Sequence, residues 1–295
     1  MNAYVNRNCP VCQQVSTGEQ LPYPITLTRK SSLTFEYIIA CSNCGLAWAE
    51  PVASQVQLDN FYSNGDYWDK LIPESLSQRA HESCQAKNRV SICRAFLERE
   101  NNIKVLDIGA GHGFISRWCD ELPDISIAHY DFIEPDIDKR NEILHRKTSF
   151  RVNYKSNLDS CNKKYDLIFL NHVLEHVEDP VVFLKGVKSV LNKGGLLYIE
   201  VPHNDHLHKI DVFPHTLFFN KNSLIQVAIQ DDLEMVATQS FGRNNKGIVN
   251  WCISQMNKVA VYLKIEKLQI YFDAKQWGYD KFSTEGIWLY IIVKA

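Results

Sequence analysis

A short apolar run that ends in a glycine-rich turn constrains the fold of this chain most. Residues 104–108 (KVLDI) predict a buried strand, and residues 109–113 (GAGHG) follow it directly. Glycines let the backbone turn sharply and approach a ligand without a clash from Cβ. In an open α/β sheet, ligands bind beyond the carboxyl ends of the strands. We therefore expect an α/β domain with a ligand at this turn.

Strands and helices alternate along the rest of the chain. We expect strands at 104–108, 125–133, 165–170, 196–201, 234–241 and 287–293, and helices at 74–100, 115–121, 136–145, 180–191 and 220–229. Such alternation predicts a parallel sheet with helices on both faces. Residues 242–285 are interpreted as a mainly helical insertion that splits a terminal antiparallel hairpin.

An acidic residue at the end of the second expected strand adds to the glycine turn. Glu134 lies where a carboxylate can accept hydrogen bonds from both hydroxyls of a ribose. A dinucleotide is the alternative ligand, but its fingerprint is Gly-x-Gly-x-x-Gly. Here the glycines stand at 109, 111 and 113, and Asp107 precedes them. This spacing favours a methyl donor over a dinucleotide.

Four segments resemble, in order, the motifs of class I S-adenosylmethionine-dependent methyltransferases. They are VLDIGAGHGF at 105–114, FIEP at 132–135, YDLIFLNHVLEHVEDP at 165–180 and LNKGGLLYIEVP at 191–202. The resemblance implies a Rossmann-like, doubly wound, mainly parallel seven-stranded sheet. It also implies S-adenosylmethionine as the methyl donor.

The resemblance further implies which residues contact the donor. Asp107 would hold the amino end of the donor's methionine, and Glu134 would bind its ribose. Asn171 and His172 would lie beside the sulfonium. The expected donor-binding set is Asp107, Gly109, Gly111, Gly113, Glu134, Asn171 and His172. The adenine contact stays open.

Two Cys-x-x-Cys pairs lie near the amino end, with strand-like residues 25–39 between them. They consist of Cys9 with Cys12 and Cys41 with Cys44. Four thiolates at this spacing suit a tetrahedral, structural Zn²⁺, since a four-cysteine site leaves no coordination position open for catalysis. Four unligated buried cysteines are the alternative. A ribbon of this kind resembles the front end of bacterial methyltransferases that act on sugars or other small metabolites.

The expected domains are a zinc ribbon at 1–50, a helical and aromatic linker at 51–100, and the methyltransferase core at 101–295. In similar enzymes an aromatic segment in the linker closes over the donor, and here it would contain Tyr62, Tyr67 and Trp68. Packing in the core or against the zinc ribbon is an equally good interpretation of these three side chains.

Several histidines follow the expected strand at 196–201: His203, His206, His208 and His215. An alcohol acceptor must lose a proton, which a neutral imidazole can take near pH 7. His203 is the first candidate base, His215 the second, and His172 and His176 are alternatives on the opposite wall. A second metal site formed by His203, His206 and His208 is an alternative, but no acidic residue is clearly placed to act as its further ligand.

The composition limits the kinds of partner that we expect for this protein. The 32 basic and 34 acidic residues give a net charge of −2, which argues against a nucleic-acid partner because phosphates favour basic surfaces. No run is long and apolar enough for a membrane helix. The polar first residues and the odd number of cysteines, nine in all, predict a cytoplasmic protein.

Three functions are therefore considered. The first is methyl transfer from S-adenosylmethionine to a small-molecule acceptor, such as a sugar or a nucleotide-linked metabolite, by in-line displacement with a histidine base. The second is an RNA or protein methyltransferase that grips its substrate with the zinc ribbon. The third is a non-catalytic scaffold with a vestigial donor site. The oligomeric state stays open.

Overall fold

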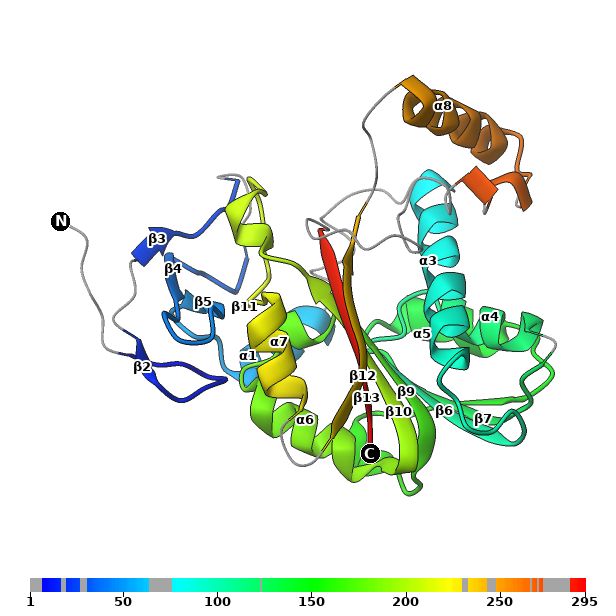
Figure 1. Cartoon of the computed structure of the whole chain (residues 1–295), viewed down its shortest axis with the longest axis horizontal. Helices are drawn as coiled ribbons and strands as arrows, with labels where there is room; N and C mark the ends of the chain where they lie inside the picture. Colours follow the sequence, from blue (N-terminus) through cyan, green and yellow to red (C-terminus); the bar gives the residue numbers. More distant parts are fainter. Residues whose placement is uncertain are drawn as a thin grey trace.

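The computed structural model describes residues 7–16, 20–26, 31–63, 76–122, 124–229, 233–242, 248–265, 267–269, 271–272 and 287–295. Within them, a large central sheet carries helices on both faces, and a smaller sheet lies to one side of it (Figure 1). The aromatic pair Tyr67 and Trp68 lies outside the described residues.

The central sheet has seven strands in the order β12-β13-β10-β9-β6-β7-β8. Their bounds are β6 Ile103–Ile108, β7 Ile127–Ile133, β8 Arg151–Tyr154, β9 Tyr165–Asn171, β10 Leu191–Pro202, β12 Glu234–Phe241 and β13 Trp288–Lys294. Strands β6 to β10 pair in parallel, whereas β13 runs antiparallel to both of its neighbours. The prediction of a mainly parallel, doubly wound sheet is confirmed.

Helices cover the two faces of this sheet (Figure 1). One face carries α3 Leu76–Arg94, α4 Phe114–Glu121 and α5 Ile137–His145, and the other carries α6 Pro180–Ser189 and α7 Lys221–Ala228. Successive strand side chains serve opposite faces, so that Val105 packs on the α3 side and Leu106 on the α6 side. Helix α3 ends six residues before the expected boundary at 100.

Capping side chains fix where several helices begin. Asp136 accepts a hydrogen bond from the Lys139 backbone N–H at the start of α5, and Asn220 does the same for Ser223 at the start of α7. Each side chain satisfies a backbone donor that has no partner inside its helix.

The smaller sheet has the order β11-β5-β4-β3. Its strands are β3 Gln20–Pro22, β4 Tyr37–Ala40, β5 Ala47–Glu50 and β11 Leu217–Phe218, and a separate hairpin pairs β1 Arg7–Asn8 with β2 Val15–Ser16. Within the strand-like stretch 25–39, residues 31–36 form no strand, because Leu33 and Phe35 pack into a cluster with Phe213.

Strand β11 ties the amino-terminal part to the core. It comes from the segment after β10, yet it pairs with β5, so that Leu217 lies opposite Trp48. The backbone N–H of Ala49 also donates to the carbonyl of Thr216 at 2.8 Å. The two regions therefore share one sheet and one apolar cluster.

The remaining elements connect these layers. They are α1 Gln55–Ser63, α8 Ile248–Tyr262 and the short 3-10 turns η1 Leu158–Ser160, η2 Leu174–His176 and η3 Asp205–Leu207. Helix α8 falls in the expected insertion between β12 and β13, and it lies near the end of α3 (Figure 1). Much of 242–285, with Trp277, lies outside the described residues. Among those described, no helix is both long and apolar enough to cross a membrane.

Candidate functional site

The glycine turn joins β6 to α4, and two of its glycines lie in different surroundings. Gly109 (φ +71°) packs so tightly that a Cβ there would lie 2.3 Å from Cγ2 of Val173. Gly111 (φ +51°) faces open space, with no heavy atom within 4 Å of the place a Cβ would take. The turn is thus closely packed at Gly109 and open at Gly111, and the open side leaves room for a ligand close to the backbone.

Glu134 lies at the end of β7 and holds the turn in place. Its Oε2 accepts a hydrogen bond from the Gly111 backbone N–H at 2.7 Å, and its Oε1 accepts one from Asp136 at 2.9 Å. Burial raises the pKa of Glu134 to about 7. Each carboxylate oxygen has a second lone pair, so Glu134 can still accept hydrogen bonds from a ligand beside Gly111.

Two buried oxygens at neighbouring strand ends have unused hydrogen-bonding capacity. Oδ2 of Asp107 accepts from the Tyr130 hydroxyl at 2.5 Å, whereas Oδ1 of Asp107 and Oδ1 of Asn171 have no hydrogen-bond partner among the described residues. Burial raises the pKa of Asp107 to about 6. Unsatisfied buried acceptors are costly, so these two oxygens indicate a place for a ligand's donor groups.

A buried group of charges lies next to Asn171. Arg89 on α3 donates from Nε to Oε2 of Glu200 at 3.0 Å, and His172 places its Nε2 3.1 Å from Oε1 of Glu200. Nδ1 of His172 lies 3.3 Å from Oε1 of Glu175. Burial alone lowers the pKa of His172, but Glu175 and Glu200 outweigh it and raise the pKa to about 9.

A second histidine group continues from Glu175 toward the smaller sheet. The backbone N–H of Thr216 donates to the carbonyl of Glu175 at 2.8 Å, which places His215 beside η2. The rings of His176 and His215 meet edge-on, with centroids 4.9 Å apart. Burial lowers the pKa of His176 to about 3, so this imidazole is neutral near pH 7.

Polar partners fix both of these rings. Nδ1 of His215 lies 2.8 Å from Oδ2 of Asp205, and Nδ1 of His176 lies 2.7 Å from the Tyr62 hydroxyl. Burial alone would raise the pKa of Asp205, but His215 outweighs it and holds the pKa at about 2. An imidazole oriented by a carboxylate is typical of catalytic and metal-binding sites.

The other expected histidines lie around the end of β10. The backbone N–H of His203 donates to the carbonyl of Ile287 at 2.9 Å, and its side chain is half-buried. His206 packs its ring against Phe218 at 5.0 Å, whereas the side chain of His208 is exposed. These three histidines therefore lie in different surroundings, and the metal grouping found among the described residues does not include them.

The four paired cysteines converge on one point. Their Sγ atoms all lie within 4.8 Å of one another. Sγ of Cys9 is 3.6 Å from Sγ of Cys44, and Sγ of Cys12 is 3.5 Å from Sγ of Cys41. A tetrahedral Zn²⁺ with Zn–S bonds of about 2.3 Å holds sulfurs roughly 3.8 Å apart. The donor set thus fits zinc.

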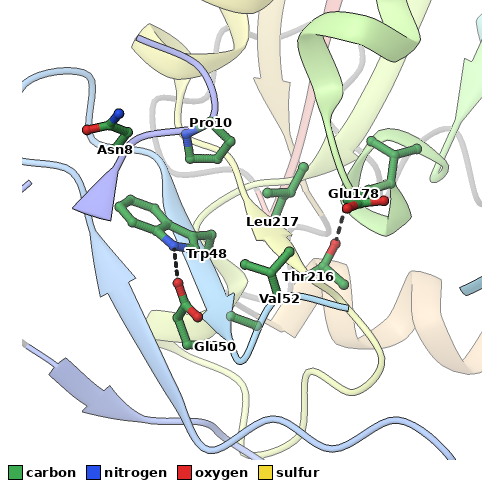
Figure 2. A pocket seen from close by; sticks show the side chains of 10 residues that line it. Asn8, Pro10, Trp48, Glu50, Val52, Glu178, Thr216 and Leu217 are labelled. Atoms are coloured by element: carbon green, nitrogen blue, oxygen red, sulfur yellow. Dashed lines mark hydrogen bonds between the residues drawn. The ribbon is translucent and has the colours of Figure 1, made fainter. Parts of the chain in front are cut away.

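A cavity of about 480 Å³ lies between the smaller sheet and the core. Figure 2 shows Trp48 and Glu50 on one side of it and Glu178, Thr216 and Leu217 on the other. The Trp48 Nε1–H donates to Oε1 of Glu50 at 3.2 Å. None of the expected donor-binding residues lines this cavity, so it is separate from the glycine turn.

Sequence reasoning missed the residues that support the site. Arg89 lies in the middle of an expected helix whose pattern indicates no binding role, and Glu200 lies within an expected strand. Asp205 stands between His203 and His206 in the sequence, and this position was a usable signal for a carboxylate beside a histidine. Tyr62 was named, but its contact with His176 crosses more than a hundred residues.

Comparisons with known proteins agree with the fold described above. A family model described as "Methyltransferase domain" matches residues 76–244. A methyltransferase from Leishmania major that depends on S-adenosylmethionine superposes with a TM-score of 0.51 at 14% identity, covering 81% of this chain and 82% of that one. The cyclase SpnF superposes with a TM-score of 0.51 at 13% identity, covering 83% and 97%. These likenesses concern the fold alone.

Similar curated proteins are named for two kinds of acceptor. A tRNA U34 carboxymethyltransferase from Campylobacter fetus is 26% identical over 64% of this chain and 62% of its own length. A ubiquinone biosynthesis O-methyltransferase from Pelagibacter ubique is 31% identical over 33% of this chain and 41% of its own length. The chain thus spans less than two thirds of these relatives, and the expectation against a nucleic-acid partner finds no support in them.

The family match covers more than half of the chain, and it includes the central sheet except β13, the glycine turn and the acid that follows β7. The chain belongs to the methyltransferase domain family, in the class that uses S-adenosylmethionine.

Proposed function

We propose that this protein transfers a methyl group from S-adenosylmethionine to a small-molecule acceptor. The observation that carries the proposal is the pair of buried oxygens on the neighbouring strands β6 and β9, Oδ1 of Asp107 and Oδ1 of Asn171, which have no hydrogen-bond partner among the described residues. The donor's ammonium group supplies the missing hydrogen bonds. Because an ammonium also stabilises a nearby carboxylate, donor binding lowers the pKa of Asp107.

In this proposal, residues at different strand ends bind different parts of the donor. Asp107 and Asn171 hold the amino end of its methionine, and the backbone of Gly109, Gly111 and Gly113 lies along it. Glu134 accepts hydrogen bonds from the ribose hydroxyls. Its existing bond to the Gly111 N–H supports this role, because the same bond keeps the turn open for the ligand.

The donor supplies an electrophilic methyl group on a sulfonium. Transfer forms one bond from the acceptor atom to the methyl carbon, breaks the S–CH₃ bond and leaves S-adenosylhomocysteine. The chain's part is to align the acceptor with that bond and to exclude water. We place the acceptor beside Glu175, His176 and His215, since His172 directly follows Asn171 in the chain and its Nδ1 lies 3.3 Å from Oε1 of Glu175.

The charge of His172 determines what it does in this site. With a pKa of about 9 it is protonated near neutral pH, so it orients Glu175 and Glu200 and does not take the acceptor's proton. His203 stays a prediction as a base. An active His203→Ala variant would remove that role.

We also propose that Cys9, Cys12, Cys41 and Cys44 bind a structural Zn²⁺. Sulfur spacings of 3.5 and 3.6 Å support it. The metal would fix the amino-terminal part, which in turn holds β11 and the neighbouring His215 in place. Four thiolates leave no open position, so the zinc takes no part in methyl transfer.

A tRNA acceptor is the second candidate, favoured by the name of the Campylobacter fetus relative. The experiment that separates the two supplies methyl-labelled S-adenosylmethionine with either a small-molecule extract or total tRNA. We expect label in the small-molecule fraction, at a rate that changes little between about 50 and 200 mM salt. Labelled tRNA, with a rate that falls steeply with salt, would contradict the proposed acceptor class.

A further inference from the structure

Three side chains with metal-binding chemistry converge between η2 and β11. They are Glu175, His176 and His215, and each offers a ligand atom within 4.8 Å of the other two. Glu175 and His176 come from the turn after β9, whereas His215 arrives from the segment after η3. The Thr216 N–H bond to the Glu175 carbonyl joins the two segments, so the fold itself builds this grouping.

Each imidazole is already held through its Nδ1 atom. Asp205 holds His215 at 2.8 Å, and the Tyr62 hydroxyl holds His176 at 2.7 Å. In the ring of His215, Nε2 therefore faces away from Asp205, and Nε2 of His176 lies 3.9 Å from Oε1 of Glu175. Metal-binding histidines almost always have such an oxygen partner on the second ring nitrogen, because it fixes the tautomer and the ring orientation.

The carboxylate of Glu175 completes the grouping. Its side chain is 1% exposed, and neither of its oxygens accepts a well-aligned hydrogen bond among the described residues. Oε1 lies 3.3 Å from Nδ1 of His172, so one oxygen has a charged neighbour. No ion pair or hydrogen bond is found there for Oε2. A buried carboxylate oxygen without a partner is costly, and a bound cation would remove that cost.

We propose that Glu175, His176 and His215 bind one divalent first-row transition cation. Two imidazole nitrogens and one carboxylate oxygen suit Mn²⁺, Fe²⁺, Co²⁺ or Zn²⁺. Metal–ligand distances of about 2.1 Å bring donors to roughly 3.0–3.4 Å from one another, so the three side chains close by about an ångström on binding. Three protein ligands leave coordination positions open for another molecule.

The role of this metal site rests on the proposed function. A hydroxyl oxygen of the acceptor binds at the open coordination positions of the cation. A cation lowers the pKa of a bound hydroxyl, and its proton leaves to solvent before the methyl group arrives. The oxygen then forms the new bond to the methyl carbon. His215, expected from the sequence as a base, becomes a ligand, and Asp205 becomes the residue that positions it.

Titration with Mn²⁺ tests the site directly. Zinc-loaded protein is titrated up to about 1 mM Mn²⁺, and free Mn²⁺ is counted from its electron paramagnetic resonance signal. Thiolates select softer ions than Mn²⁺, so the four-cysteine site keeps its zinc. We expect one Mn²⁺ per chain, lost in Glu175→Gln and in His215→Asn. Asp205→Asn should weaken the affinity about tenfold, and the control His208→Asn should bind as the wild type does.

Binding of S-adenosylhomocysteine and far-UV circular dichroism show that each variant is folded. If Glu175→Gln does not fold, His215→Asn and Asp205→Asn decide the question. A wild type that binds no Mn²⁺, or a stoichiometry unchanged in the folded ligand variants, overturns the inference. Methyl transfer without Mn²⁺ binding would overturn the site alone, whereas Mn²⁺ binding without methyl transfer would overturn the proposed function alone.

Discussion

At the scale of single residues, the site depends on buried charges that balance one another. Glu200 is 1% exposed and lies between Arg89 and His172, while Glu175 lies between His172 and His176. A buried carboxylate without a cation would be strongly destabilising. The positive charge of His172 is therefore part of the folded state.

The raised pKa of His172 makes stability depend on pH in a predictable direction. Its pKa rises from 6.5 to about 9 on folding, so its contribution is fully present below pH 6.5 and is lost as pH rises through 9. Its side chain is 32% exposed, so we expect a modest loss of about 1–2 kcal/mol in the free energy of unfolding.

Urea unfolding at pH 6.5 and at pH 9.5 measures this loss. The His172→Gln variant should show a smaller fall in stability than the wild type over the same interval. If the two proteins lose stability equally, His172 is not the group responsible.

At the scale of elements, the sequence predicted the core well and the amino-terminal part poorly. Strands such as 165–170 and helices such as 136–145 have short-range signals, namely continuous apolar runs and a capping Asp136, and these agree with the structure to within a few residues. The open place at Gly111 also follows from a local motif.

The rest depends on contacts between distant segments. No local pattern indicates that Leu217 would pair with Trp48, or that Leu33 and Phe35 would pack against Phe213. The position of Asp205 among the histidines indicates a carboxylate beside an imidazole, but only the fold shows that its partner is His215. Residues close in space but distant in sequence leave no periodic signal in a single chain.

The pairing of β11 with β5 couples the cysteine site to the acceptor side. Removing zinc with a chelator, or replacing Cys41 with Ser, should loosen β5 and so displace the neighbouring His215. Donor binding should survive, because the glycine turn lies on the other strands. We expect turnover to fall at least about tenfold while the affinity for S-adenosylhomocysteine stays within about twofold, given that structural zinc contributes to folding energy.

Turnover assays paired with binding titrations check this coupling. The matched control is Cys161→Ser, since Cys161 lies outside the metal group. Equal loss of donor binding and turnover would show that the cysteine site supports the whole chain and not the acceptor side.

At the scale of the whole molecule, the residues of the proposed donor and acceptor sites lie along one edge of the central sheet. Strand ends β6, β7 and β9 supply Asp107, Glu134 and Asn171, and the following turns carry the histidines toward the smaller sheet. The proposed donor site thus belongs to the part of the chain that the family model matches. The proposed acceptor site lies at the junction with the amino-terminal part.

Calorimetric titration with S-adenosylhomocysteine tests the central claim most directly. The wild type should bind one molecule per chain with a Kd in the micromolar range, about −7 to −8 kcal/mol. Gly111→Ala places a methyl group in the open space above the turn without a clash, at a φ of +51° that strains an alanine by about 1–2 kcal/mol. We therefore expect the variant to stay folded, as far-UV circular dichroism would show, and to bind at least about tenfold more weakly. A folded, zinc-loaded wild type that gives no binding, or a Gly111→Ala variant that binds equally well, would contradict the account.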